Sequence, residues 1–343
     1  MSDTTEFGLD TFGDVTVDLD GKRLSQAQVI RNLVDEAKLA DSLGVDFIGV
    51  GEHHRDDFAV SSPETVLAGI ATVTERIRLG SAVTVLSSDD PVRVFERFAT
   101  VDALSNGRAE IILGRGSFTE SFPLFGLDLA QYTELFEQKL DLMAEVLKEG
   151  PVTWSGSLRA PLTEQHIYPK TESGRIPTWI GVGGSPESVV RAARYGMPLF
   201  LAIIGGAPER FVPFADLFRR ANSQLEQELP IAVHSPGFIA DTDAEAAELM
   251  WPHHKASRDR IGAERGWGPV TPDEYQHEIE HGSLYVGSPE TVARKIANTV
   301  STLGVQRFDL KYSSGTLPHE HTMRSIELYG TKVIPMVRDV LAG

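Results

Sequence analysis

Cysteine is absent from the 343-residue sequence. Disulfide bonds, cysteine-ligated zinc, iron–sulfur clusters and cysteine nucleophiles are therefore excluded. A chain without cysteine suits a reducing compartment, and we expect a cytoplasmic protein.

Long hydrophobic runs and an excess of basic residues are also missing. No run of about 18 apolar residues is present, so we expect no transmembrane helix. The polar residues 1–6 likewise predict no signal peptide. Lys and Arg total 32 against 49 Asp and Glu, a formal net charge of −17. This charge repels phosphate backbones and anionic lipids, so we expect neither nucleic acid nor a membrane as the main partner. It is compatible with one local basic site for a small anion.

The motifs of several chemistries are missing too. His253 and His254 belong to no His-x-x-x-His or clustered carboxylate pattern that would support a metal site. We therefore predict no metal, and we interpret the two histidines as a solvated pair in a mobile loop. No Gly-x-Ser-x-Gly hydrolase elbow is present. The segment 181–183 does not complete a dinucleotide fingerprint, because Pro186 stands at the third glycine position and no acid follows near residue 201.

Short apolar runs alternate with longer amphipathic stretches along the chain. Eight runs are predicted to be strands: 7–12, 46–51, 77–86, 109–114, 177–182, 198–204, 231–240 and 308–312. Helices are predicted after Ser25 and over 63–76, 91–104, 132–148, 186–195, 208–225 and 289–303. Eight such repeats favour an α/β fold, a (β/α)8 TIM barrel that forms one domain over residues 1–343. An open doubly wound sheet is the alternative, but it usually has fewer strands.

A barrel of minimal size leaves residues over for insertions. Residues 151–176 are rich in Pro, Ser and Thr, and residues 241–286 follow the seventh predicted strand. Long loops at the carboxyl ends of barrel strands commonly shape active sites. We therefore expect the second insertion to act as a lid.

Candidate functional residues follow the predicted strands, where a barrel carries its active site. Side chains alternate along a strand, so His53 and His54 should point to opposite sides; His53 is the better candidate for an imidazole over a ligand. The alternative is a structural pair. Arg115 lies between two glycines, and its guanidinium suits a phosphate, although a surface or interface arginine is the plainer interpretation.

A glycine pair precedes a helix start at residues 183–188. Ser185 is predicted as the N-cap and Pro186 as the first helical residue, and free N–H groups there suit a phosphate. The same Ser-Pro-Glu triplet recurs at 62–64 and 288–290, so the triplet alone indicates only a helix start. The glycine pair distinguishes this copy.

Taken in order, these segments resemble the bacterial luciferase-like monooxygenase family. The segments that carry the resemblance are 51–54, 77–83, 90–94, 102–108, 114–116 with 122–126, 183–188 and 287–292. The resemblance implies a barrel that binds reduced FMN, which a separate flavin reductase commonly supplies. It implies oxygenation of an aldehyde or another small organic substrate by O₂.

The resemblance also implies roles for particular residues. His53 would lie beside the reactive edge of the flavin as the catalytic imidazole. The cofactor-binding residues would be Ala82 and Val83 beneath the flavin ring, where the family often has a cis peptide bond, and, around the phosphate, Arg115, Gly183, Gly184, Ser185 and Ser188. Family members are typically dimers through their second and third helices, so a homodimer is expected, with Glu52 and His54 near its interface.

The sequence departs from the family pattern at two positions. Gly114 stands where luciferase has a reactive cysteine, which argues against light emission. Thr133 stands where a second phosphate-contacting arginine is expected, with Arg191 and Arg194 as nearby substitutes or as solvated residues of a helix. Four aromatic residues are candidates for an apolar wall of the site or for ordinary core: Phe12, Phe118, Phe122 and Trp179.

Two other functions within the same fold remain as alternatives. One is an oxidoreductase that uses the deazaflavin F420. The other is a flavin-binding protein without catalysis, against which the presence of His53 argues mildly. The identity of the substrate does not follow from the sequence.

Overall fold

The computed structural model describes residues 5–223 and 228–343, so the last two residues of the helix predicted over 208–225 lie outside the described part. Within it, eight parallel strands form a closed ring, because the last strands pair with both neighbours and return to the first. In ring order they are β1 (Glu6–Thr11), β2 (Phe47–Val50), β3 (Arg78–Ser81), β5 (Ala109–Gly114), β8 (Thr178–Val182), β9 (Leu199–Ala202), β10 (Ile231–Ile239) and β12 (Arg307–Lys311). The predicted (β/α)8 barrel is confirmed, and the open doubly wound sheet is wrong.

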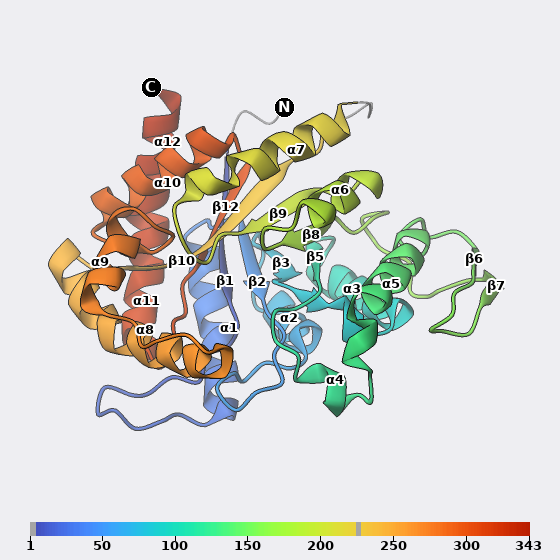
Figure 1. The fold of residues 1–343 in the computed structure, drawn as a ribbon, viewed down its shortest axis with the longest axis horizontal. Helices are drawn as coiled ribbons and strands as arrows, with labels where there is room; N and C mark the ends of the chain where they lie inside the picture. Colours follow the sequence, from blue (N-terminus) through green and yellow to red (C-terminus); the bar gives the residue numbers. More distant parts are fainter. Residues whose placement is uncertain (1–4, 224–227) are drawn as a thin grey trace.

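Helices surround the barrel (Figure 1). The main ones are α1 (Gln26–Ser42), α2 (Pro63–Ala71), α3 (Pro91–Ser105), α5 (Tyr132–Val146), α6 (Pro186–Arg194), α7 (Val212–Asn222), α10 (Pro289–Leu303), α11 (His319–Leu328) and α12 (Ile334–Ala342). Shorter pieces are α4 (Ser121–Leu124), η1 (Leu86–Ser88), η2 (Leu129–Gln131), η3 (Pro208–Phe211) and η4 (Tyr329–Val333). Ser185 and Ser288 cap α6 and α10 through their side chains, whereas Ser62 makes no such bond at α2.

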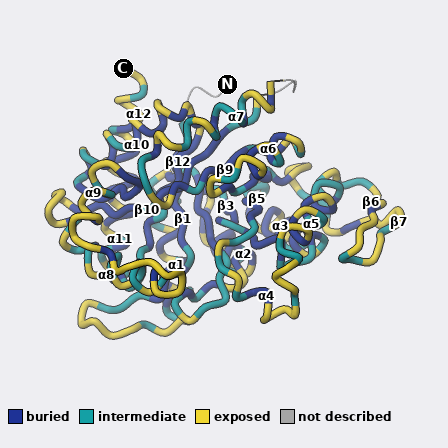
Figure 2. Tube along the Cα trace, viewed as in Figure 1, coloured by how far each residue is buried: buried dark blue, intermediate teal, exposed yellow. Residues whose placement is uncertain are grey.

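Burial is concentrated in the strands and on the inner faces of these helices (Figure 2). Inside the barrel, Phe47, Trp179 and Phe200 belong to one apolar layer. The guanidinium of Arg307 lies 3.5 Å from the centre of the Phe47 ring and pairs with Asp309 at 2.7 Å; all of its surface is buried. This packed interior closes one end of the barrel, so a ligand has access only at the carboxyl ends of the strands, here called the barrel mouth.

The run predicted as one strand over 77–86 is two strands. β3 ends at Ser81 and lies between β2 and β5 in the sheet. β4 (Thr84–Val85) is a separate strand that pairs with β5 and does not continue β3. The peptide bond between Ala82 and Val83 lies in the interruption and is cis. The single-strand prediction was wrong because hydrophobic alternation does not register a break of two residues.

Both predicted insertions are structured. The first contains an antiparallel hairpin, β6 (Val152–Trp154) and β7 (Leu162–Gln165), and the second contains α8 (Asp243–Arg265), α9 (Pro272–Glu280) and β11 (Tyr285–Gly287). The prediction of a mobile loop around His253 and His254 was wrong, because both lie on α8 and are partly buried. These helices pack over their own apolar cluster, whose members are Phe238, Ala240, Ala246, Met250, Tyr275, Leu284, Val286 and Leu317. Among the described residues, no helix is long and apolar enough to cross a membrane.

Candidate functional site

His53 lies at the barrel mouth, three residues beyond the end of β2. Its imidazole is surrounded by aromatic rings: the ring centroids of Phe12, Phe58 and Phe118 lie 4.9, 4.4 and 5.1 Å away. The side chain is 11% exposed. An imidazole in such an enclosure can exchange a proton with a ligand while most bulk water is kept away.

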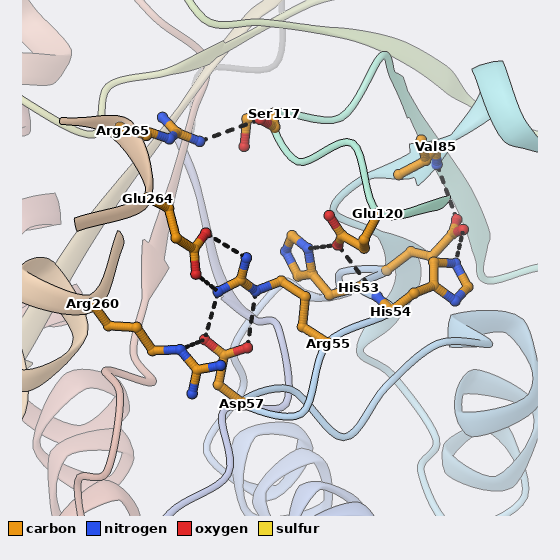
Figure 3. Close-up of polar contacts among 11 residues, drawn as sticks. His53, His54, Arg55, Asp57, Val85, Ser117, Glu120, Arg260, Glu264 and Arg265 are labelled. Carbon is orange, nitrogen blue, oxygen red and sulfur yellow. Dashed lines mark hydrogen bonds and ion pairs between the residues drawn. The ribbon is translucent and has the colours of Figure 1, made fainter. Parts of the chain in front are cut away.

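Glu120 is the acidic partner of this imidazole. Its Oε1 atom lies 3.7 Å from Nδ1 of His53 and accepts a long hydrogen bond of 3.4 Å from the backbone N–H of His54 (Figure 3). Burial raises the pKa of Glu120, but hydrogen bonds from His53 and from backbone N–H groups outweigh it, and the net pKa is lowered. A carboxylate held ionised beside Nδ1 favours a proton on that nitrogen.

His54 has a different environment, as the alternation along the chain predicts. Its Nε2 atom lies 3.0 Å from Oε1 of Glu52, and this hydrogen bond raises the pKa of His54. The other carboxylate oxygen of Glu52 accepts a hydrogen bond of 3.0 Å from the N–H of Val85. The pair therefore anchors β4 to the segment that carries His53, which is a structural role.

Ala82 and Val83 pack against three glycines that carry no side chain. A Cβ atom on Gly49 would come 2.8 Å from that of Ala82, and one on Gly114 would come 2.5 Å from Cγ2 of Val83. A Cβ atom on Gly181 would lie 3.1 Å from Val83. The side chains of Ala82 and Val83 occupy the space that these three glycines leave free. A side chain at any of the three glycine positions would crowd them.

Arg115 follows β5 at the same end of the barrel. Its guanidinium lies 5.4 Å from the ring centre of Tyr132, whose hydroxyl donates a hydrogen bond of 2.7 Å to the carbonyl of Gly116. Within residues 5–223 and 228–343 Arg115 forms no ion pair. An arginine without a carboxylate partner is available to an anion.

The glycine pair before α6 is open. A Cβ atom on Gly183 would meet nothing within 4 Å, and Gly184 has a φ of +118°, which favours glycine. The side chain of Ser185 accepts the N–H of Ser188 at 3.3 Å and caps the helix. The hydroxyl of Ser185 donates to Glu187, and this hydrogen bond, together with the charges of Arg191 and Arg115, lowers the pKa of Glu187.

Thr133 stands where the family pattern is expected to have a second arginine, with Arg191 and Arg194 as the nearby candidates for its place. Thr133 is exposed on α5. Arg191 on α6 is 12% exposed at its side chain and donates through Nη1 to Oγ of Ser188 at 3.2 Å. Glu137 on α5 holds its Nη2 at 2.7 Å. Arg194, by contrast, is exposed.

The end of α8 is fastened to the segment after β2. Arg55 donates to both carboxylate oxygens of Glu264, at 2.7 and 2.6 Å, and to Asp57 at 2.9 Å (Figure 3). Arg260 reaches Asp57 at 3.3 Å. The bond to Arg55 lowers the pKa of Glu264. We call these ion pairs the α8 latch.

Three further contacts join α8 and α9, here called the helix pair, to the ends of other strands. Arg265 donates to the carbonyl of Ser117, after β5, at 3.2 Å. Nδ1 of His253 lies 2.8 Å from the hydroxyl of Thr316, after β12. On α9, the carboxylate of Glu278 accepts the N–H of Gly206, after β9, at 3.2 Å. The helices thus contact the rim of the barrel mouth at four strand ends.

The four candidate wall residues divide into two groups. Phe12 and Phe118 contact the ring of His53. Phe122 is 1% exposed and packs beside Tyr132, and Trp179 belongs to the inner barrel layer. Sequence reasoning missed Glu120 and Phe58, which carry no motif; their position in loops after strands was the available signal.

The residues present fit a flat cofactor with an anionic tail. The structure places three features at the barrel mouth: Ala82 and Val83 packed on three glycines, the N-terminus of the nine-residue helix α6, and Arg115, which has no ion-pair partner among the described residues. The donors of that N-terminus and of Arg115 match phosphate oxygens. The roles of these residues remain predictions.

Comparisons with known proteins show which family and which solved structures the chain is similar to. A family model described as luciferase-like monooxygenase matches residues 6–307. The alkanal monooxygenase alpha chain of the Kryptophanaron alfredi symbiont is 28% identical over 68% of this chain and 65% of its own length.

Solved structures extend the likeness of the fold over the whole chain. The monooxygenase RslO1 from Streptomyces bottropensis has a TM-score of 0.83 at 22% identity, covering 96% of this chain and 99% of its own. The oxygenating constituent of 3,6-diketocamphane monooxygenase from Pseudomonas putida, in complex with FMN, has a TM-score of 0.77 at 19% identity. The match covers 97% of this chain and 98% of that one. The F420-dependent tetrahydromethanopterin reductase from Methanopyrus kandleri has a TM-score of 0.72 at 19% identity. The match covers 97% of this chain and 99% of that one.

Proposed function

The chain belongs to the luciferase-like monooxygenase family, and from this premise we propose that it uses reduced FMN and O₂ to oxygenate an aldehyde or another small organic substrate. The observation that carries the proposal is the placement of His53, enclosed by aromatic rings and paired with Glu120, at the same mouth as the glycine-lined segment and Arg115. Reduced FMN, when bound, supplies the electrons with which O₂ is activated.

The chain's own residues would hold the cofactor at its two ends. Ala82 and Val83 would support the ring. The phosphate would be bound by the Arg115 guanidinium, by the N–H groups of Gly183, Gly184 and Ser185, and by the hydroxyl of Ser188. Arg191, which donates to Ser188 at 3.2 Å, would supply the second positive charge. Two cations and a helix N-terminus suit the dianionic phosphate of FMN.

His53 would be the catalytic imidazole. Glu120, whose Oε1 atom lies 3.7 Å from Nδ1, would favour a proton on that nitrogen and so leave Nε2 to accept or return a proton. Phe12, Phe58 and Phe118 would limit access of water.

A second candidate is an F420-dependent oxidoreductase. The fold favours it to nearly the same degree, because a reductase that uses F420 matches with a TM-score of 0.72. The candidates differ in their oxidant: the first consumes O₂ and the second does not.

The experiment that tests the proposal compares the two cofactors in the full-length protein. We expect reduced FMN, regenerated by a separate flavin reductase, to support O₂ uptake coupled to oxidation of one member of an aldehyde panel. His53→Gln should lower the coupled rate by at least about a hundredfold, whereas His281→Gln, at an exposed position, should not. F420 turnover without O₂ uptake would establish the second candidate. We also propose a homodimer, which sedimentation would test.

A further inference from the structure

A further histidine–carboxylate pair lies inside the barrel, apart from the residues assigned above. Nδ1 of His234 on β10 is 2.5 Å from Oδ2 of Asp10 on β1. Asp10 has no exposed surface and His234 is 4% exposed. The two strands flank β12, where Asp309 is the register partner of His234. The pair therefore bridges three adjacent strands inside the barrel.

The hydrogen bonds of this pair are incomplete. An ionised carboxylate can only accept, so the shared proton belongs to Nδ1, and a neutral imidazole then presents a lone pair at Nε2. Within residues 5–223 and 228–343, Oδ1 of Asp10 is buried without a hydrogen-bond partner, and the hydrogen bond that the His234 ring forms there is made by Nδ1 and not by Nε2. Lys311 on β12 does not supply one, because its ammonium group is held by Asp14 at 3.2 Å and by a backbone carbonyl.

The position of His234 links it to the candidate site. The centre of its ring is 6.1 Å from that of Phe12, with the planes 20° apart, and 6.3 Å from that of Phe200. Phe12 in turn lies 4.9 Å from His53. One phenyl ring is thus the neighbour of both imidazoles, and the ring of Phe200 is a second aromatic neighbour of His234.

We propose that Nε2 of His234 accepts a hydrogen bond from a hydroxyl or N–H group of the organic substrate, with Asp10 as the positioning residue that fixes its tautomer. The inference rests on the proposed function and narrows its substrate class. Beside the rings of Phe12 and Phe200, a single oriented acceptor selects ligands that carry a donor, because a ligand without one leaves the acceptor unpaired. The substrate is therefore an apolar, preferably aromatic, compound with a hydroxyl or N–H group.

The tautomer is tested first, by NMR of the full-length protein labelled with ¹⁵N-histidine. The His234 signals are assigned from their loss in His234→Gln, with His281→Gln as the matched control. We expect a protonated Nδ1 and an unprotonated Nε2 at neutral pH, and a mixture of tautomers in Asp10→Asn. An unchanged tautomer in Asp10→Asn would show that Asp10 does not fix it and would overturn its role as a positioning residue. Protonation of both nitrogens at neutral pH would overturn the proposal, because Nε2 could not then accept.

The ligand preference is tested with matched probes: benzyl alcohol, phenol and aniline as donors, benzaldehyde and anisole as molecules without one. The donors should shift the Nε2 resonance of His234 and lose at least about tenfold in affinity in His234→Gln. Benzaldehyde and anisole should do neither. A resonance that no donor moves, or equal responses to both groups, overturns the proposal. Failure of reduced FMN to support O₂ uptake in the unaltered protein instead contradicts the proposed function and leaves these measurements standing.

Discussion

Gly114 and the side chain of Val83 pack closely against each other at the end of β5. A Cβ atom on Gly114 would lie 2.5 Å from Cγ2, 3.1 Å from Cβ and 3.3 Å from Cγ1 of Val83. The absence of a side chain at 114, where the family pattern has a cysteine, is therefore matched to the presence of valine at 83. The two positions form one packing unit of the proposed flavin site.

Gly114→Ala should displace Val83, because the close contact is with a branched side chain that has little freedom. We expect a loss of about 1–3 kcal/mol in the free energy of unfolding, measured by urea denaturation, together with weaker FMN binding. Val83→Ala in the same chain should restore much of both. If the double variant is as unstable as Gly114→Ala alone, the two residues are not coupled as described.

Arg115 should bind the cofactor through its phosphate alone. Arg115→Gln is expected to weaken FMN binding by at least about tenfold, since hydrogen bonds to charged groups contribute about 1.5–3 kcal/mol. The affinity for riboflavin, which lacks the phosphate, should change little. Arg194→Gln, at an exposed position on α6, is the control. An equal loss for both ligands in Arg115→Gln would show that the arginine acts on the ring or on the fold instead.

The α8 latch should control how often the helix pair leaves the barrel mouth. Glu264→Gln removes the charge that Arg55 holds at 2.6 and 2.7 Å, so amide hydrogen exchange in α8 should become faster. Added salt should also make amide exchange in α8 faster in the unaltered protein, because salt screens the ion pair between Arg55 and Glu264. In the variant, which lacks this ion pair, salt should change the exchange less. Glu248→Gln is the control, since Glu248 is exposed on the same helix. Unchanged exchange in Glu264→Gln would count against the latch.

The barrel and its helix starts could be predicted from the sequence because their signals are local. The run 109–114 is mostly apolar and is a strand with those bounds. The helix Pro289–Leu303 follows its cap, Ser288, and carries an apolar face. The break at Ala82 and Val83 is different: it depends on glycines at 49, 114 and 181, which are distant in the sequence. Local periodicity does not record such packing.

The candidate site was predictable where one residue carries its own motif. His53 and Arg115 each follow a strand, and parallel strands bring their carboxyl ends together. Glu120 was not predictable, because its contact with His53 depends on how a loop of weak pattern folds back. The helical form of residues 243–265 was missed for a related reason: Pro252 and the scattered apolar residues weaken the helical pattern, and the helix is stabilised by packing on Tyr275 and Leu284.

The last prediction concerns His254, which that packing encloses. Burial, reinforced by the charge of Arg258, lowers the pKa of His254 from 6.5 to about 4. Between these values the unfolded chain binds a proton that the folded protein does not. The free energy of unfolding should therefore fall as the pH drops from 6.5 toward 4, with this residue contributing up to about 3 kcal/mol.

The contribution of His254 is isolated by comparing variants. His254→Phe keeps an aromatic ring beside Tyr275, 5.2 Å away in the structure, and cannot take up a proton. Urea unfolding measured across this pH range should show a shallower slope for His254→Phe than for the unaltered protein. His281→Gln, at an exposed position, should keep the original slope. Because His253 also has a lowered pKa, through burial and the charge of His321, some pH dependence should remain. Parallel curves for His254→Phe and the unaltered protein would mean that His254 titrates normally and that α8 does not enclose it in solution.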